Sequence, residues 1–575
     1  MKAYTTLSQI MRIVVLSALP LASQAAEPPK TAEVPEWALG VLTFPQLGMG
    51  LQKTSAYANH VLLNSGQLAN QIIMNALFKL PMSAEFPSDR PASIYLLNPL
   101  SMGLGNETAC VLPISDAKAF KAEWVNALGA PAEDHEVMTF TIPQPLPNPD
   151  KFLVAKFTKE GKVLLVAPSH IILKSLEDWT NRPGDAIPIE DVVLTLKVAN
   201  IKRDFGALAL GSLEYGAAMA AQNPQQGERL KVWMNDILNA LWSMDVVRAS
   251  LKISQDGSTA GIEISACASP DAPLPTWITI SSSSAIGLLA GEMPTDAALK
   301  TFFSINGRKC ADWLDAQFLP AQANAPDSAE RLCVEGRHAL NDFIRVMDGE
   351  AAIGFGGMKA DWYFLLMLNA SSPRQAEDNF KLAVTKLHQM LCASDMEAAQ
   401  MSKPLPIPTF NLSENYSGTA IHHAELDSFL DYILPLHYAV LGNRFEVAAG
   451  PSGLIKLKGA IDALHHKPKT TNDQPILPKL DGDTVAVSFI HFLRLAGMDL
   501  GIVPPGIDIE KLSGDLVESP VTLSARLSKG LFALRLDIPA NVPQSLFTLV
   551  QRAQNAAGIM KRQSQNPQNA SAPDN

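Results

Sequence analysis

The feature that most constrains this chain is an apparent internal duplication. Residues 38–42 read Ala-Leu-Gly-Val-Leu and residues 285–289 read Ala-Ile-Gly-Leu-Leu. The pair Pro-Ser at 168–169 returns at 451–452, and each pair is followed, after one intervening residue, by two aliphatic residues. A repeated sequence folds into repeated bodies. The sequence therefore predicts two tandem modules that have diverged by insertion, because the two intervals, 285 − 38 = 247 and 451 − 168 = 283, differ.

Length and composition agree with this organisation. A chain of 575 residues exceeds what one hydrophobic core usually serves, and 47% hydrophobic with 18% charged residues is a globular composition. We expect a first module over residues 26–275 and a second over 285–552. The boundary should lie either in the Pro-rich stretch 270–275 or in the serine run 281–284, where the composition shifts to turn formers. Residues 553–575, rich in Asn, Gln and Ala without periodicity, are expected to be a disordered tail.

The fold class is predicted from glycines that stand between short apolar runs. The runs 152–157 and 162–166 flank Gly161, and Gly257 and Gly442 stand between similar runs. Glycine at such positions accepts the positive φ of a hairpin turn, and strands joined by hairpins are antiparallel. Helix-like segments alternate with these hairpins. Each module is therefore predicted to be α+β, with helices on one face of an antiparallel sheet.

The N-terminus predicts export. Lys2 and Arg12 precede a short apolar run at 13–19, and small residues lead up to Ala25. This is the pattern of a secretory signal peptide over residues 1–25, and the run is too short to remain as a membrane-spanning helix. An uncleaved membrane anchor is the alternative. We expect a soluble periplasmic or extracellular protein of a bacterium, without a transmembrane segment after cleavage.

The charge argues against nucleic-acid binding. The formal net charge is −11, and loss of Lys2 and Arg12 with the signal peptide would make it −13, since no acidic residue precedes Glu27. An acidic surface repels phosphate backbones, and no basic stripe interleaved with aromatic residues reverses this locally.

Five cysteines would enter an oxidising compartment: Cys110, Cys267, Cys310, Cys333 and Cys392. An odd number leaves at least one unpaired. A bond between Cys310 and Cys333 would close a Pro/Ala-rich loop and stabilise the fold by about 3 kcal/mol. The alternative is five buried thiols that pack as small apolar residues. No Cys-x-x-Cys pattern occurs, so neither a redox dithiol nor a zinc knuckle is indicated.

Three patterns resemble catalytic motifs. Gly-Pro-Ser-Gly at 450–453 places Ser452 at a strand-to-helix joint, but the hydrolase pattern Gly-x-Ser-x-Gly is incomplete. Ser115 and Lys118 match Ser-x-x-Lys, yet helix capping explains the serine better. His135-Glu136 begins the zinc pattern His-Glu-x-x-His, which Thr139 breaks. None of them supports a catalytic residue.

The weak metal candidates are His423, Asp427 and Asp431. If a helix begins near Ala424, the two aspartates lie four residues apart on one face, and His423 stands beside that turn. The alternative is solvated side chains at a strand end and a helix start. No metal or other cofactor is predicted.

The leading hypothesis is therefore a non-catalytic exported protein that binds or scaffolds another component of the cell envelope. One alternative is a carrier that holds a lipid-like apolar ligand between the two modules. A hydrolase with a loop-assembled site is the other, because catalytic groups need only be near in space.

Overall fold

The protein is described by a computed structural model. It describes residues 33–565 except for 79–86, 88, 103–107, 135, 143–150, 160, 181–189, 221–230, 232–233, 236–237, 240, 269–285, 287–288, 319–327, 358–360, 397–406, 427–433, 466–483, 498–508, 518 and 529–530. The predicted signal peptide lies outside these residues. The chain forms two compact units. The N-terminal unit comprises Glu27–Leu274 and Gly530–Gln544, and the C-terminal unit comprises Met1–Ala26, Pro275–Lys529 and Ser545–Asn575.

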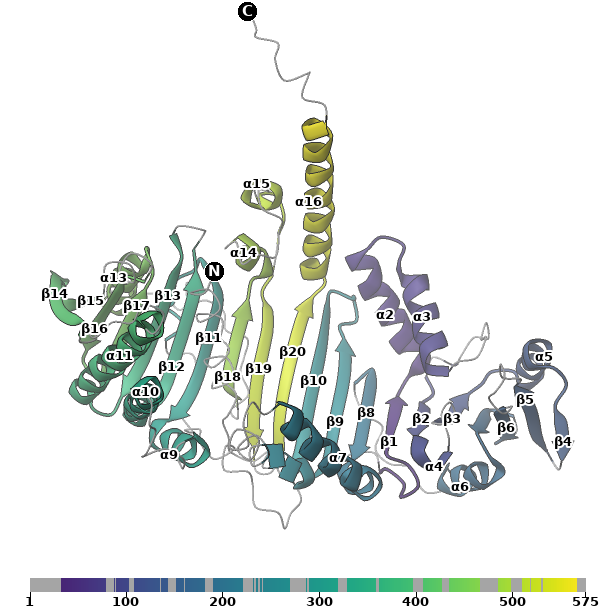
Figure 1. The fold of residues 1–575 in the computed structure, drawn as a ribbon. Coiled ribbons are helices and arrows are strands. Elements are labelled where there is room, and N and C mark those ends of the chain that lie inside the picture. The colour runs from purple at the N-terminus through teal and green to yellow at the C-terminus, as the bar shows by residue number, and fades with distance from the viewer. Residues whose placement is uncertain are drawn as a thin grey trace, which may run out of the picture. The chain divides into compact units, whose positions relative to one another are not determined.

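The N-terminal unit contains one antiparallel sheet (Figure 1). Its strands pair in the order β4-β5-β6-β7-β3-β2-β1-β8-β9-β10-β20. Their bounds are β1 Gly40–Phe44, β2 Ala92–Leu96, β3 Thr108–Pro113, β4 Ala132–Asp134, β5 Val137–Ile142, β6 Lys151–Thr158, β7 Val163–Ala167, β8 Val192–Lys197, β9 Met244–Ile253, β10 Thr259–Ala268 and β20 Leu531–Pro539. Strand β20, from the end of the chain, thus belongs to this sheet.

Helices lie on both faces of this sheet. Their bounds are α2 Leu47–Val61, α3 Gly66–Phe78, α4 Pro99–Met102, α5 Ala117–Leu128, α6 His170–Thr180 and α7 Val198–Ala220. Helix α5 packs Phe120 and Trp124 into a core with Phe140 and Leu164. Helix α6 packs into a second core that contains Leu165, the neighbour of Leu164. Successive strand residues point to opposite faces, so the two cores lie on opposite sides.

The strands of the C-terminal unit also pair antiparallel, in the order β14-β15-β16-β17-β13-β12-β11-β18-β19. Its strands are β11 Ala297–Asn306, β12 Met347–Gly356, β13 Tyr363–Ala370, β14 Thr409–Tyr416, β15 Thr419–Glu425, β16 Leu436–Leu441, β17 Arg444–Ala449, β18 Thr484–Ile490 and β19 Val521–Ser528.

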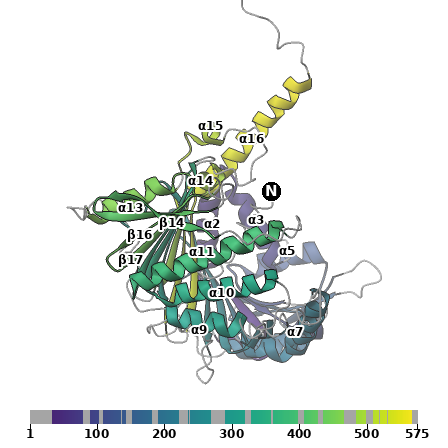
Figure 2. The same cartoon turned by 60° about the vertical axis from the view of Figure 1, so that its left-hand side comes forward.

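Helices cover both faces of these strands too, and they are α9 Gly307–Phe318, α10 Ser328–Arg345, α11 Pro373–Met396 and α13 Gly453–His465. Three more helices, α14 Phe492–Gly497, α15 Ile509–Ser513 and α16 Asn541–Gln565, pack on one another in a separate apolar cluster. Figure 2 shows α9, α10 and α11 as one layer, which meets the sheet through Phe343, Phe380 and Phe445. Helix α13 packs Leu457 and Ile461 into the core of the other face.

The architecture confirms an α+β fold with antiparallel sheets and corrects one part of the prediction. We expected helices on one face of each sheet, whereas both faces carry helices. The prediction assumed that each strand has one apolar side. Strand β7 is apolar on both sides, since Leu164 and Leu165 are both fully buried. Such a strand needs cover on both faces.

The two sheets have matching connectivity. Strand β11 corresponds to β1, and the neighbours on either side correspond in turn. The order β4-β5-β6-β7-β3-β2-β1-β8-β9 of the N-terminal unit therefore matches, strand by strand, the order β14-β15-β16-β17-β13-β12-β11-β18-β19 of the C-terminal unit. The Pro-Ser pairs occupy matching places, because Ser169 precedes α6 after β7 and Ser452 precedes α13 after β17. The other sequence match does not fit this order. Residues 38–42 lead into β1, whereas Leu289 lies in a turn before β11.

The end of the chain also differs from expectation. We expected a disordered tail from residue 553, but α16 continues to Gln565. Its Arg552 forms ion pairs with Asp515 and its Ser545 Oγ donates to the carbonyl oxygen of Val517 at 2.9 Å. An Asn/Gln/Ala-rich composition therefore did not prevent helix formation, because Ala and Gln are good helix formers. Residues 566–575 lie outside the described part.

Candidate functional site

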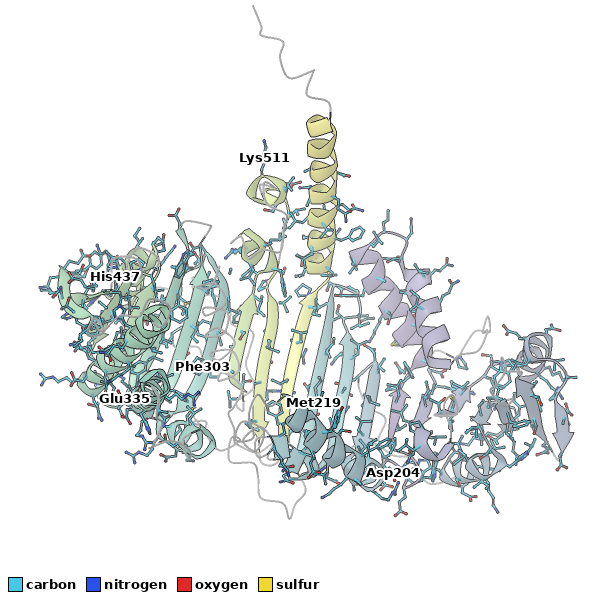
Figure 3. The ribbon with its side chains drawn as sticks, viewed as in Figure 1. Asp204, Met219, Phe303, Glu335, His437 and Lys511 are labelled. Carbon is cyan, nitrogen blue, oxygen red and sulfur yellow. The ribbon has the colours of Figure 1, made fainter. Side chains whose placement is uncertain are left out.

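Of the three weak metal candidates, the structure describes only His423. Strand β15 runs through His423 to Glu425, so the helix that we expected to begin near Ala424 does not start there. Asp427 and Asp431 lie outside the described residues. His423 instead pairs across the sheet with His437, with ring centroids 4.8 Å apart (Figure 3). Within the described residues, no group of three or more His, Cys, Asp or Glu side chains is arranged to hold a metal ion.

The serine patterns are helix starts. Ser169 Oγ accepts a hydrogen bond from Ile172 N at 3.3 Å, and the backbone oxygen of Ser452 accepts from Lys456 N at 3.2 Å. Beside Ser115, it is Asp116 that caps α5, by accepting from Lys118 N and Ala119 N. The residues of the His-Glu near miss lie in the β4–β5 region, where Glu136 adopts a φ of 70°. These positions serve local structure.

The cysteine prediction fails at Cys310. Its thiol is free and buried in α9, and burial raises its pKa to about 11. Cys110 is also free and fully enclosed, which raises its pKa to about 12. Such thiols stay protonated and behave as small apolar side chains, which is the alternative that the sequence left open. The side chains of Cys333 and Cys392 are outside the described part.

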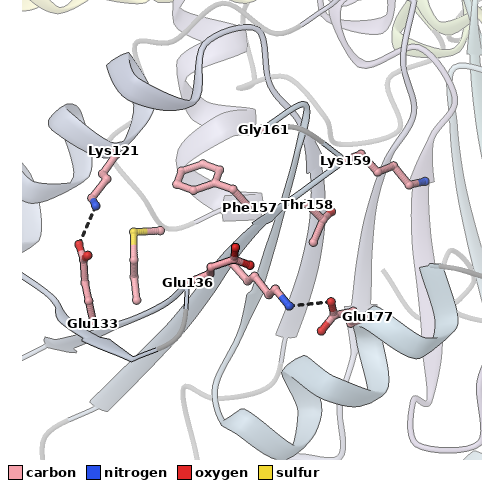
Figure 4. Close-up of a pocket in the computed structure, with 10 residues that line it drawn as sticks. Lys121, Glu133, Glu136, Phe157, Thr158, Lys159, Gly161 and Glu177 are labelled. Carbon is pink, nitrogen blue, oxygen red and sulfur yellow. Dashed lines mark hydrogen bonds and ion pairs between the residues drawn. The ribbon is translucent and has the colours of Figure 1, made fainter.

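A groove of about 650 Å³ lies at the β4–β6 edge of the N-terminal unit (Figure 4). It is lined mainly by charged side chains, which form the pairs Lys121–Glu133 at 2.6 Å and Lys156–Glu177 at 2.7 Å. These pairs are partly exposed, so each contributes little stability. The lining residues include no histidine, cysteine or serine. The groove therefore offers a salt-bridged surface on which the carboxylates of Glu133 and Glu177 are engaged in ion pairs.

A more informative surface lies on strands β8, β9, β10 and β20, where polarity and burial are reversed. One cross-strand row on their first side consists of Thr195, Arg248, Ser265 and Ala533. These residues are only 1%, 8%, 6% and 1% exposed. Arg248 is neutralised there by Glu190 at 2.8 Å. In this row the polar side chains are therefore buried.

The opposite side of the same strands is apolar, and within the described part of the chain it is only partly covered. Three cross-strand rows compose it: Val192–Leu251–Ile262–Leu536, Leu194–Ala249–Ile264–Leu534 and Leu196–Val247–Ala266–Phe532. We call these twelve residues the apolar sheet face. None of them is buried. Ile262 is 39% exposed and Ile264 is 49% exposed, although the adjacent Ser265 is 6% exposed.

Helix α2 bounds the apolar sheet face at the β9–β10 turn. Tyr57 Oη donates to the carbonyl oxygen of Ile538 at 3.5 Å, and His60 Nε2 lies 3.0 Å from the carbonyl oxygen of Asp256. Gly257, at a φ of 72°, comes so close that a Cβ there would lie 2.6 Å from Tyr57 N. The next row, Ile253 and Ala260, is buried. Helix α2 thus closes the apolar sheet face at the end where β9 turns into β10.

Chemically, the apolar sheet face can only bind. Its twelve side chains carry no hydrogen-bonding group, and the backbone groups of β9 and β10 are paired within the sheet. A contiguous apolar surface of this kind costs free energy in water and is typical of a ligand or partner site. Sequence analysis predicted the hairpin of β9 and β10 but not this site, because the order of apolar and polar residues does not say which side of a strand is covered.

The C-terminal unit carries the opposite anomaly. Glu446 on β17 is completely buried, and neither carboxyl oxygen has a hydrogen-bond partner among the described residues. Burial, followed by the neighbouring charge of Glu292, raises the pKa of Glu446 to about 8. The charge of Arg444, two residues away, offsets this rise only in part, and Arg444 is itself paired with Glu292. Glu446 is therefore mainly protonated at neutral pH.

Comparison of the chain with known protein families, curated proteins and solved structures finds no match. In the described part of the chain, no helix has the length and apolarity to cross a membrane.

Proposed function

We propose that this is an exported, non-catalytic binding protein of a bacterial cell envelope, and that the apolar sheet face of its N-terminal unit holds the acyl chain of a lipid-like ligand. The carrying observation is the reversal on β8, β9, β10 and β20, where Ser265 is buried and its neighbours Ile262 and Ile264 are exposed. Alternation normally places the apolar side of a strand in the core. A ligand bound to the apolar sheet face would bury these side chains, as the rule requires.

The chemistry of the face favours an acyl chain. A ligand with donors or acceptors would leave them unpaired against these twelve side chains, at a cost of about 1–3 kcal/mol each. An acyl chain has none. Burying about ten methylene groups would gain on the order of 8 kcal/mol before the cost of immobilisation. We place the ligand on this face within one unit, rather than between the modules as the sequence suggested.

We also propose that the two units descend from one duplicated module. The matching strand order and the matching position of the two Pro-Ser joints support this, although the match between residues 38–42 and 285–289 does not. The scaffolding hypothesis needs an apolar protein partner on the same face. The hydrolase alternative has no observation in its favour among the described residues.

The experiment is a titration of delipidated mature protein with a fluorescent fatty acid. The double variant Ile262→Glu/Ile264→Glu puts two charges on the face, and we expect it to bind at least tenfold more weakly. Both side chains are already substantially exposed, so the fold should tolerate the change. The matched control is Ile171→Glu, at a residue of α6 that is 79% exposed, which should bind like the wild type.

Equal binding by the double variant and the wild type would refute the proposal. Native mass spectrometry of gently purified protein provides a second readout. A lipid-sized added mass that the double variant lacks supports the carrier. An added mass equal to a second chain or another protein, lost in the double variant, would assign the face to scaffolding instead.

A further inference from the structure

A group of basic side chains gathers around the start of β11 in the C-terminal unit. Lys300 stands on β11 opposite Phe489 of β18. Just after β18, His491 N donates to the carbonyl oxygen of Ala298 at 2.8 Å. Arg494 of α14 donates through Nη1 to the carbonyl oxygens of Thr295, at 2.8 Å, and Ala297, at 3.2 Å. Three elements thus bring Lys300, His491 and Arg494 to one place.

The nearby acid is already engaged. Asp296 Oδ2 accepts from Lys456 Nζ at 2.6 Å and its Oδ1 accepts from Tyr363 Oη at 3.0 Å. The group therefore holds three cations, Lys300, Arg494 and Lys456, against one carboxylate, an excess of two positive charges. This runs against the chain as a whole, which carries a net charge of −11.

No other acidic side chain among the described residues is paired with this group. Lys300 Nζ has no hydrogen bond or ion pair among the described residues, and the side chain is half-buried. Burial, then repulsion from Arg494, lowers the pKa of Lys300, and Asp296 offsets this only in part. Burial and the charges of Arg494 and Lys300 lower the pKa of His491 to about 4. His491 is thus neutral at pH 7 and can still donate one hydrogen bond.

We propose that Lys300, His491 and Arg494 form a binding site for a doubly charged oxyanion of the phosphate class. A dianion would balance the two excess charges. The guanidinium nitrogens of Arg494 that face no carbonyl oxygen, the Lys300 ammonium and the His491 ring supply donors of the kind that phosphate oxygens accept. The positive side chains would repel a metal cation. A ligand with a single carboxylate would neutralise only one of the two excess positive charges. The site is independent of the apolar sheet face.

Isothermal titration calorimetry of the full mature protein with inorganic phosphate at low ionic strength tests the site. We expect saturable binding that sodium chloride of equal ionic strength does not reproduce. Lys300→Met should weaken phosphate binding at least tenfold. It should also raise the thermal midpoint without phosphate, because it removes a half-buried unpaired charge. The control is Lys458→Met, which removes a lysine that is paired with Glu414 at 2.7 Å and should leave phosphate binding unchanged.

Arg494→Gln serves as a second variant and should also weaken binding if Lys300→Met does not fold. A shift of the His491 ring resonances on phosphate addition would place the ion at the site. The source of the phosphate is distinguished by sedimentation with phosphatidylcholine vesicles with and without phosphatidic acid. Binding to the latter alone, lost in Lys300→Met, indicates a lipid headgroup, and binding of free phosphate only indicates a soluble ligand. Equal response of Lys300→Met and the wild type in both assays would overturn the proposal.

Discussion

The two units break the same polarity rule in opposite directions. The N-terminal unit exposes Ile262 and Ile264 while it buries Ser265, and the C-terminal unit buries Glu446 without a hydrogen-bond partner among the described residues. If the two units are aligned on the serines of the Pro-Ser joints, Ser169 and Ser452, the residue of β7 that corresponds to Glu446 of β17 is the apolar Val163. Two units with one strand order thus place their unfavourable residues differently. Such departures from stability point to sites where another demand acts.

The largest expected effect concerns Glu446. Its pKa is raised in the folded chain from 4.5 to about 8, so the folded state retains a proton that the unfolded state loses. Stability should be highest below about pH 4.5 and fall as pH rises to about 8, by up to about 1.4 kcal/mol per pH unit. Glu446→Gln should remove this slope and stabilise the protein at pH 8 by several kcal/mol. Urea unfolding at a series of pH values measures it.

The control for this prediction is Glu414→Gln, at a partly exposed carboxylate that pairs with Lys458. It should leave the slope between pH 5 and pH 8 in place. An identical slope in the wild type and in Glu446→Gln would mean that Glu446 is hydrated or paired, and the contrast between the units would disappear.

The second prediction compares covered and open parts of the N-terminal sheet. Leu165 of β7 is completely buried, so Leu165→Ala should cost about 2–5 kcal/mol. Ile264→Ala should cost about 1 kcal/mol or less, since the side chain is half exposed. Denaturant unfolding of delipidated protein tests both. A cost of several kcal/mol for Ile264→Ala would show that the apolar sheet face is covered in solution.

The smallest expected effect separates the two Pro-Ser joints. Ser169→Ala removes the hydrogen bond from Ile172 N and should lower stability by about 1 kcal/mol. Ser452→Ala removes no side-chain bond that the described residues show, and its effect should be within about 0.5 kcal/mol. Thermal unfolding measures the difference. If Ser452→Ala instead abolished an esterase activity of the wild type, Ser452 would have to be treated as a nucleophile.

Local signals in the sequence were reliable where they rest on one turn or one helix end. Gly161, Gly257 and Gly442 do adopt positive φ between paired strands, because no other residue reaches that conformation so cheaply. A polar side chain satisfies the first amides of the helix at both expected starts, although the residue that caps α5 is Asp116 and not Ser115. The export signal remains a prediction.

The candidate site could not be predicted in the same way. The three rows of the apolar sheet face join residues from β8 to β20 that lie more than 300 positions apart, since Val192 and Leu536 share one row. The cluster around Lys300 joins β11 to residues that follow β18. The sequence analysis instead singled out His423, which lies in strand β15, and Asp427 and Asp431, which lie outside the described residues.

The amino-acid sequence by itself determined the hairpins, the helix starts and the alternation of each strand, because these depend on the conformational preferences of a few adjacent residues. Only the tertiary structure decided which side of β10 is covered and which charges meet without a counterion. Burial and electrostatic neutralisation depend on what packs against a residue, and that is set by segments far away in the chain. The apolar sheet face and the cluster around Lys300 are therefore properties of the assembled units and of no single segment.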